Sequence, residues 1–207
     1  MTTAAICDKL VLYLSATEYC REIGSKECAA LFAQENENMR AYNMKDFPNY
    51  VFGVPNFEKT REFRRLPREL FPEGSGLHTY GQRTPGARVC FKTDADRFTV
   101  RGRLAKMTFD KGMSIFACQS VAVMLGEREN STFIGLTGPD NYETLTFERE
   151  FTKPTDTQEV TLWLPRNEQV ADIEILLPDG ASFNPPTPYK YGKALYYGSS
   201  ITEGGCC

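Results

Sequence analysis

The chain has 207 residues, enough for one domain of ordinary size with an appendage and too few for two complete catalytic domains. Hydrophobic residues make up 41% of it and charged residues 25%, a composition that can bury a core and is unlike that of a disordered tail. The formal net charge of -3 argues against non-specific electrostatic binding to nucleic acid or to an anionic membrane, so neither is expected as a partner.

The chain contains a single histidine, His78. A metal site that needs two imidazoles is therefore excluded within these residues, and a Ser-His-Asp triad could use only His78. The sequence also lacks a phosphate-binding loop and a dinucleotide fingerprint. We predict no metal and no cofactor.

Cysteine usage and hydropathy bear on the compartment. The seven cysteines are odd in number and include no Cys-x-x-Cys pair, a pattern that suits free thiols in a reducing environment. The apolar run Leu10–Leu14 has Asp8 ahead of it and no basic n-region, so it is a poor secretory signal. No stretch approaches the roughly 20 apolar residues of a membrane span. We expect a cytoplasmic protein.

The first part of the chain favours helix. Between Thr17 and Tyr42 apolar residues recur at helical intervals among many charged ones, which predicts one or two helices within an N-terminal helical segment at residues 1–44. After Asn43 repeated prolines predict short extended pieces and turns.

From Ala87 onward apolar and polar residues alternate. In Arg97–Leu104 the residues Phe98, Val100 and Leu104 face one way, which predicts a half-buried strand. The same alternation returns in four later segments separated by turn signals, namely 120–125, 143–147, 158–164 and 172–177. Short strands without helical patterns between them predict a mainly β fold, an antiparallel β-sandwich of jelly-roll-like topology, at residues 45–188.

Residues 189–207 follow the proline-rich Asn184–Pro188. They predict a short strand at Lys193–Tyr197, a turn at Gly198 and a helix start at Ser200–Glu203, whose Ser-x-x-Glu form is a capping box. At such a turn a serine hydroxyl is presented beside backbone N–H groups, and a helix N-terminus favours developing negative charge, so Ser200 is a candidate nucleophile. The alternative is that Ser200 only caps the helix.

Tyr197–Cys206, which reads Tyr-Gly-Ser-Ser-Ile-Thr-Glu-Gly-Gly-Cys, resembles the first conserved block of the SGNH (GDSL-type) hydrolases. Ser199 stands where that block usually has Asp, a departure found in one branch of the family. Further upstream, four segments resemble the β-sandwich that precedes the catalytic domain in that branch: Arg64–Pro67, Gly86–Asp94, Leu162–Pro165 and Val170–Ile173. The resemblance covers about residues 45–207.

The resemblance implies that residues 45–188 are the accessory sandwich of a serine esterase and that residues 189–207 begin its hydrolase domain. It implies an acylated carbohydrate or another small ester as substrate, with Ser200 as nucleophile and the Ser200 backbone N–H as one oxyanion donor. The family's triad Asp and His and most of its oxyanion hole lie in later blocks. We therefore expect this chain by itself to be inactive as an esterase.

Other interpretations stay open. A stand-alone carbohydrate-binding module could use an aromatic platform and a basic stripe, formed by Trp163, Tyr142 and Tyr196 and by Lys92, Arg97, Arg101 and Arg103. A structural domain could form homo-oligomers if Leu195, Tyr196 and Tyr197 pair with a second copy as an exposed edge strand. An improvised dyad of Ser200 with His78 is a further option.

Overall fold

The structure is a computed structural model and describes residues 39–109, 111–192, 194–196 and 198–203. The chain divides into two compact units, Met1–Met39 and Arg40–Cys207, and the second unit carries the β-sheets. The helices expected from Thr17 to residue 38 lie outside the described residues, as do Cys7, Cys20, Cys28, Cys206 and Cys207.

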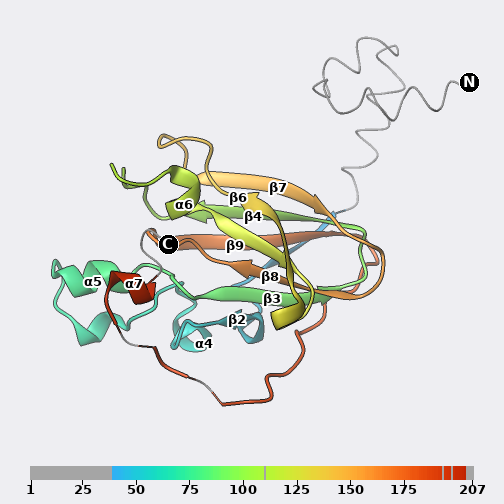
Figure 1. The fold of residues 1–207 in the computed structure, drawn as a ribbon, viewed down its shortest axis with the longest axis horizontal. Coiled ribbons are helices and arrows are strands. Elements are labelled where there is room, and N and C mark those ends of the chain that lie inside the picture. Colours follow the sequence, from blue (N-terminus) through green and yellow to red (C-terminus); the bar gives the residue numbers. More distant parts are fainter. Residues whose placement is uncertain (1–38, 110, 193, 197, 204–207) are drawn as a thin grey trace, which may run out of the picture. The chain divides into compact units, whose positions relative to one another are not determined.

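The described residues form two β-sheets, whose strands run across the molecule in Figure 1. The first sheet has the strand order β1-β9-β4-β7 and the second has the order β2-β3-β8-β5-β6. The strands are β1 (Met39–Asn43), β2 (Val51–Phe52), β3 (Arg88–Thr93), β4 (Arg97–Leu104), β5 (Val121–Leu125), β6 (Thr132–Thr137), β7 (Thr146–Thr152), β8 (Gln158–Trp163) and β9 (Val170–Pro178).

The order of the strands is that of a jelly roll. With the two-residue β2 set aside, β1, β4, β7 and β9 form one sheet while β3, β5, β6 and β8 form the other, so the chain repeatedly crosses between sheets. The β3–β8, β4–β7, β4–β9, β5–β6 and β5–β8 pairs are all antiparallel. The predicted mainly β class and jelly-roll-like sandwich are confirmed.

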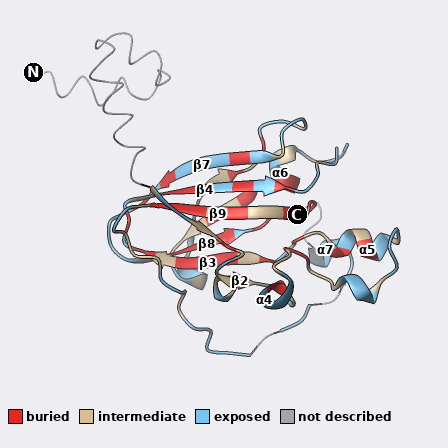
Figure 2. Cartoon of the chain, turned by 180° about the vertical axis from the view of Figure 1, so that it is seen from behind, coloured by how far each residue is buried: buried red, intermediate tan, exposed pale blue. Residues whose placement is uncertain are grey.

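The core lies between the sheets and is built from alternate strand positions, as the red stripes in Figure 2 show. Phe98 of β4 stacks on Phe151 of β7 with ring centroids 5.6 Å apart. Phe98 also meets Phe91 of β3 edge-on at 5.9 Å, and this pair joins the two sheets. Burying one such side chain contributes about 1.5–3 kcal/mol.

Short helices occupy the connections. They are η1 (Pro48–Tyr50), α4 (Phe57–Thr60), η2 (Arg68–Leu70), α5 (Gly76–Gly81), α6 (Ile115–Gln119), η3 (Arg128–Asn130) and α7 (Ser200–Glu203). Ser75 and Ser114 cap α5 and α6, because their hydroxyls accept the backbone N–H groups of His78 and Ala117. No helix in the described part of the chain is long and apolar enough to cross a bilayer.

The first correction concerns the start of the sandwich. Helix was expected as far as Tyr42, but Met39–Asn43 form β1 beside β9. Tyr42 also stacks on Phe183 with centroids 4.2 Å apart, although Phe183 follows the last strand. Local helical spacing is therefore overridden here by pairing and ring contacts with residues far along the chain.

Two further corrections concern edge strands. β7 runs over Thr146–Thr152 rather than 143–147, and β6 at Thr132–Thr137 was not expected at all. In β7 the alternation is interrupted at Arg149, whose guanidinium leaves the gap between the sheets and donates to the carbonyl of Leu136 in β6 at 2.6 Å. A position at a sheet edge can carry a charge because its side chain reaches solvent.

Gly102 of β4 allows the Phe147 ring to pack close against the backbone. A Cβ at this position would overlap the Phe147 ring and lie 2.7 Å from its Cε2 atom. Because Phe147 is buried on the neighbouring strand β7 of the same sheet, Gly102→Ala should lower the free energy of unfolding by about 1–3 kcal/mol. Urea denaturation measures the loss. Gly192→Ala is the control, since a Cβ there meets no atom within 4 Å. Equal stability of the two variants would contradict the prediction.

Candidate functional site

Ser200 lies where the sequence places it, at the start of a short helix that follows a bend at Ser199. It is exposed and begins α7, and a Cβ at Gly198 would overlap the Thr202 hydroxyl and lie 2.8 Å from Thr202 Cβ. The hydroxyl of Ser199, not that of Ser200, accepts the backbone N–H of Ile201 at 3.4 Å. The capping contact thus belongs to Ser199, and the role of Ser200 as nucleophile stays a prediction.

The strand expected just before this turn is not formed. Ala194, Leu195 and Tyr196 have no regular secondary structure, while Lys193 and Tyr197 lie outside the described residues. Leu195 and Tyr196 are 93% and 83% exposed. A strand needs the backbone hydrogen bonds of a neighbour, and no described strand pairs with these three residues.

His78 does not join Ser200 in a dyad. It is buried in α5, where its backbone carbonyl accepts a hydrogen bond from Arg64 Nη2 at 3.0 Å. None of the hydrogen bonds between described residues connects the side chains of His78 and Ser200. The structure therefore supplies no activating base for Ser200 among the contacts of the described chain.

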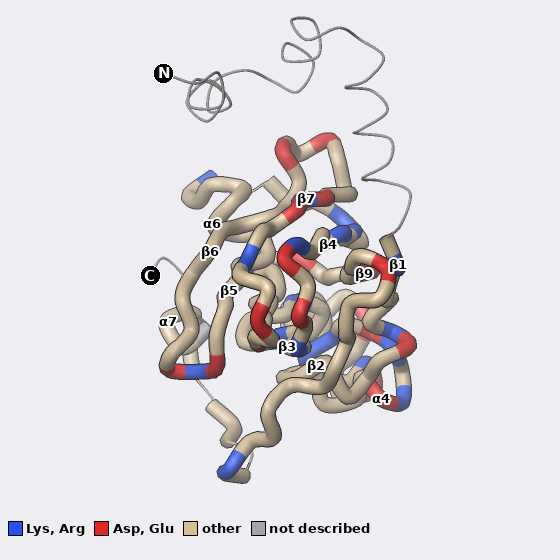
Figure 3. The backbone as a smooth tube through the Cα atoms, turned by 90° about the vertical axis from the view of Figure 1, so that its right-hand side faces the viewer, with Lys and Arg blue, Asp and Glu red and all other residues tan. Residues whose placement is uncertain are grey.

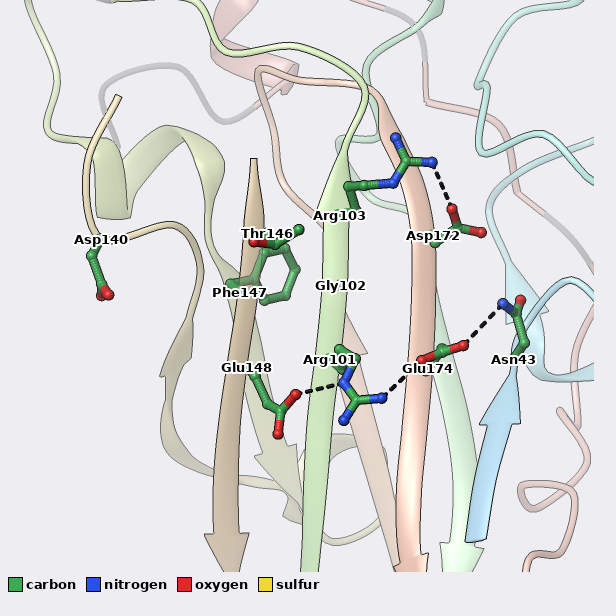
Figure 4. A pocket seen from close by; sticks show the side chains of 10 residues that line it. All are labelled: Asn43, Arg101, Gly102, Arg103, Asp140, Thr146, Phe147, Glu148, Asp172 and Glu174. Carbon is green, nitrogen blue, oxygen red and sulfur yellow. Dashed lines mark hydrogen bonds and ion pairs between the residues drawn. The ribbon is translucent and has the colours of Figure 1, made fainter. Parts of the chain in front are cut away.

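A groove of about 560 Å³ lies on the outer face of the first sheet, and its lining side chains are drawn in Figure 4. Arg101 of β4 pairs with Glu148 of β7 on one side and with Glu174 of β9, at 3.5 Å, on the other. Arg103 pairs with Asp172 at 2.9 Å, and Lys45 reaches the same carboxylate at 2.7 Å. The face is a ladder of ion pairs across three strands.

This ladder corrects the expectation of a basic stripe. Arg101 and Arg103 are matched by carboxylates of neighbouring strands, so acidic and basic positions stand side by side in Figure 3. Lys92 lies on β3 of the other sheet and pairs with Glu127 at 3.0 Å. The groove therefore has no strong field of one sign to attract a charged ligand.

The aromatic platform is not assembled either. Tyr142 packs against Phe109 with ring centroids 5.0 Å apart. Trp163 is 39% exposed, and the guanidinium of Arg88 lies over its ring, 5.1 Å from the centroid. No ring contact among the described residues joins Trp163, Tyr142 and Tyr196.

No protein-family model matches the chain, and no curated protein matches its sequence. Among solved structures it is similar to a Bacteroides ovatus protein described as a candidate GDSL-like lipase, with a TM-score of 0.61 and 15% identity over 71% of this chain and 43% of that one. It is also similar to the salicylyl-acyltransferase SsfX3 from a tetracycline biosynthetic pathway, with a TM-score of 0.47 and 22% identity over 61% of this chain and 35% of that one.

The first of these similarities shows that the two proteins share a fold over 71% of this chain. The chain spans less than half the length of either neighbour. Of the seven cysteines, the described part of the chain contains Cys90 and Cys118, and both are buried.

Asp172 links the ion pairs of the groove to stability. Partial burial acts to raise the pKa of its carboxyl, but hydrogen bonds and charge attraction from Lys45 and Arg103 outweigh burial, and the pKa lies below its ordinary value. A lowered folded-state pKa stabilises the fold above the unfolded value of about 3.9, and this contribution disappears as the pH falls through the folded value.

We expect Asp172→Asn to lose up to about 1 kcal/mol at pH 7, because the pairs are partly solvent-screened. It should also flatten the decline of stability below about pH 4. Urea unfolding at a series of pH values measures both effects. Asp179→Asn, at an exposed turn, is the control and should change neither. An unchanged acid dependence in Asp172→Asn would contradict the assignment.

Proposed function

We propose that residues 45–188 are the accessory β-sandwich of an SGNH/GDSL-type serine ester hydrolase and that Ser200 is the nucleophile of its hydrolase domain. The fold shared with a candidate GDSL-like lipase carries the proposal. The Tyr197–Cys206 motif supports it independently, because within this motif Ser200 is exposed at a turn on the C-terminal side of the sandwich.

In the proposed reaction the Ser200 hydroxyl attacks the carbonyl carbon of an ester, the alcohol leaves and an acyl-enzyme forms that water then hydrolyses. The hydroxyl becomes a strong nucleophile only when a base takes its proton, and backbone N–H groups stabilise the oxyanion. The proposed substrate class is an acylated carbohydrate or another small ester.

The proposal predicts that these 207 residues alone do not turn over p-nitrophenyl acetate above the buffer rate, because no described contact provides a base for Ser200. Ser200→Ala should then match the unchanged chain in the same assay. Turnover that disappears in Ser200→Ala would show that the chain is itself an esterase and would contradict the accessory role.

A second experiment tests the nucleophile directly. The reading frame is extended past Cys207 and the longer protein is assayed with p-nitrophenyl acetate. Ser200→Ala should lower kcat/KM by at least about a thousandfold, whereas Ser199→Ala, the matched neighbour, should retain most activity. An inactive extended protein, or a loss in Ser199→Ala alone, would refute the role given to Ser200.

One observation favours a second function, a carbohydrate-binding module. Trp163 is 39% exposed beside the guanidinium of Arg88, and an amphipathic ring that is partly exposed can contact a sugar. Because Trp163 is the only tryptophan, its fluorescence reports binding directly in a glycan titration. A saturable change that Trp163→Ala removes in a parallel calorimetric titration would support this function, and a flat response would dismiss it.

A further inference from the structure

Three polar or reactive side chains are buried on the outer face of the second sheet, the face that points away from the core. In β3 and β8, Phe91 and Val160 point into the core, so Cys90, Glu159 and Thr161 should point outward to solvent. They are nevertheless only 1%, 4% and 8% exposed. Something outside the sandwich core must therefore cover this face.

The cover is the segment Asn184–Tyr189, which we call the strap. It follows β9 and precedes the residues that lead to Ser200. Asn184 forms two backbone hydrogen bonds with Lys92 of β3, at 2.8 and 2.9 Å. Three residues later, the backbone N–H of Thr187 donates to the carboxylate of Glu159 at 2.8 Å. The strap thus crosses from the edge of β3 to the outer face of β8.

Arg128 holds the other side of the strap. Its guanidinium donates to the carbonyl of Thr187 at 2.9 Å and to that of Pro188. It also lies over the ring of Tyr189, 4.7 Å from the centroid. The backbone of Arg128 has a φ of +47°, a left-handed conformation that costs about 1 kcal/mol or more for a residue with a side chain. Such strain persists only where the surroundings enforce it.

Tyr189 closes the strap over the buried thiol. Its hydroxyl accepts hydrogen bonds from Arg88 Nε and Nη2 at 3.0 and 2.7 Å and interacts with the Cys90 thiol. Its ring centroid is 5.2 Å from the guanidinium of Arg88 and 4.7 Å from that of Arg128, and the ring meets Phe52 edge-on at 5.4 Å. Burial beneath this cover raises the pKa of Cys90.

We infer that Arg128 and Glu159 are positioning residues that hold the strap against the second sheet and so fix where the segment bearing Ser200 leaves the sandwich. Two anchors act on the same residue, since Glu159 binds the N–H of Thr187 and Arg128 binds its carbonyl. The two contacts together fix both the position and the direction of the backbone at Thr187. The catalytic role of the positioned segment rests on the proposed function. The docking of the strap does not.

The burial of the Glu159 carboxylate favours the docked state of the strap. Glu159 would lose the hydrogen bond from Thr187 if the strap lifted, and a buried carboxylate without its donors is costly. Lys92 and Glu127 reinforce the same place, because Glu127 accepts from Lys92 and from the Thr187 hydroxyl. The chain is therefore held against the sandwich as far as Tyr189, where the contacts of the strap end.

The test uses Cys90 as a reporter of strap release in the full chain. Alkylation by iodoacetamide is followed at each cysteine by mass spectrometry, in the unchanged protein and in Arg128→Gly. Glycine removes the guanidinium and accepts the left-handed backbone, so the substitution adds no strain. Cys118 is the internal control, because it is buried in α6, away from the strap.

We expect Arg128→Gly and Tyr189→Ala each to accelerate alkylation of Cys90 by about tenfold or more while Cys118 and the midpoint of urea unfolding stay unchanged. The matched control is Arg149→Ala, since Arg149 also donates to a backbone carbonyl and lies over an aromatic ring. It should leave Cys90 protected.

Acceleration of Cys90 by threefold or less in both strap variants, or equal acceleration of Cys118, would overturn the inference. If Arg128→Gly fails to fold, Tyr189→Ala decides alone, because Tyr189 is partly exposed and lies outside the sandwich core. This result is independent of esterase activity. If the strap variants expose Cys90 as expected but the extended enzyme is inactive, the proposed function is refuted and the inference about strap docking stands.

Discussion

The two sheets each present one apolar face, and neither face is stable until the other sheet covers it. The ring contacts of Phe98 with Phe91 and Phe151 join three strands of both sheets, and Gly102 lets Phe147 approach the backbone of β4. Because interiors are packed as densely as organic crystals, every connection must bring its strand to the correct sheet. The jelly-roll order reflects this requirement, since successive strands are shared between the layers.

The segment after β9 depends on that framework. Phe183 stacks on Tyr50 with centroids 4.7 Å apart, and the strap then crosses β3 and β8 to Tyr189. In Figure 1 this part of the chain runs from the end of the sandwich toward α7, the helix that begins with Ser200. A serine carried on such a segment starts from a defined point on the sandwich. Under the proposed accessory role, the sandwich would position the hydrolase segment and would take no part in the chemical step.

Much of the sandwich could be predicted because half-buried strands alternate along the chain. Arg97–Leu104 was identified with its bounds, since Phe98, Val100 and Leu104 are buried while Arg101 and Arg103 are exposed. Edge strands were missed or shifted because one side of each meets solvent, so a charge at Arg149 is tolerated and the period is broken. Met39–Asn43 was assigned to helix because its strand partner lies at the other end of the chain.

The sequence by itself determined the fold class and the helix start at Ser200, because periodicity and capping chemistry act over a few neighbouring residues. It could not show that Cys90 and Glu159 are buried, since their strand positions point outward. Only the tertiary structure decided this, by laying a segment almost a hundred residues beyond Cys90 across the face of β3. Burial on an outer face depends on contacts between distant segments, which no local pattern encodes.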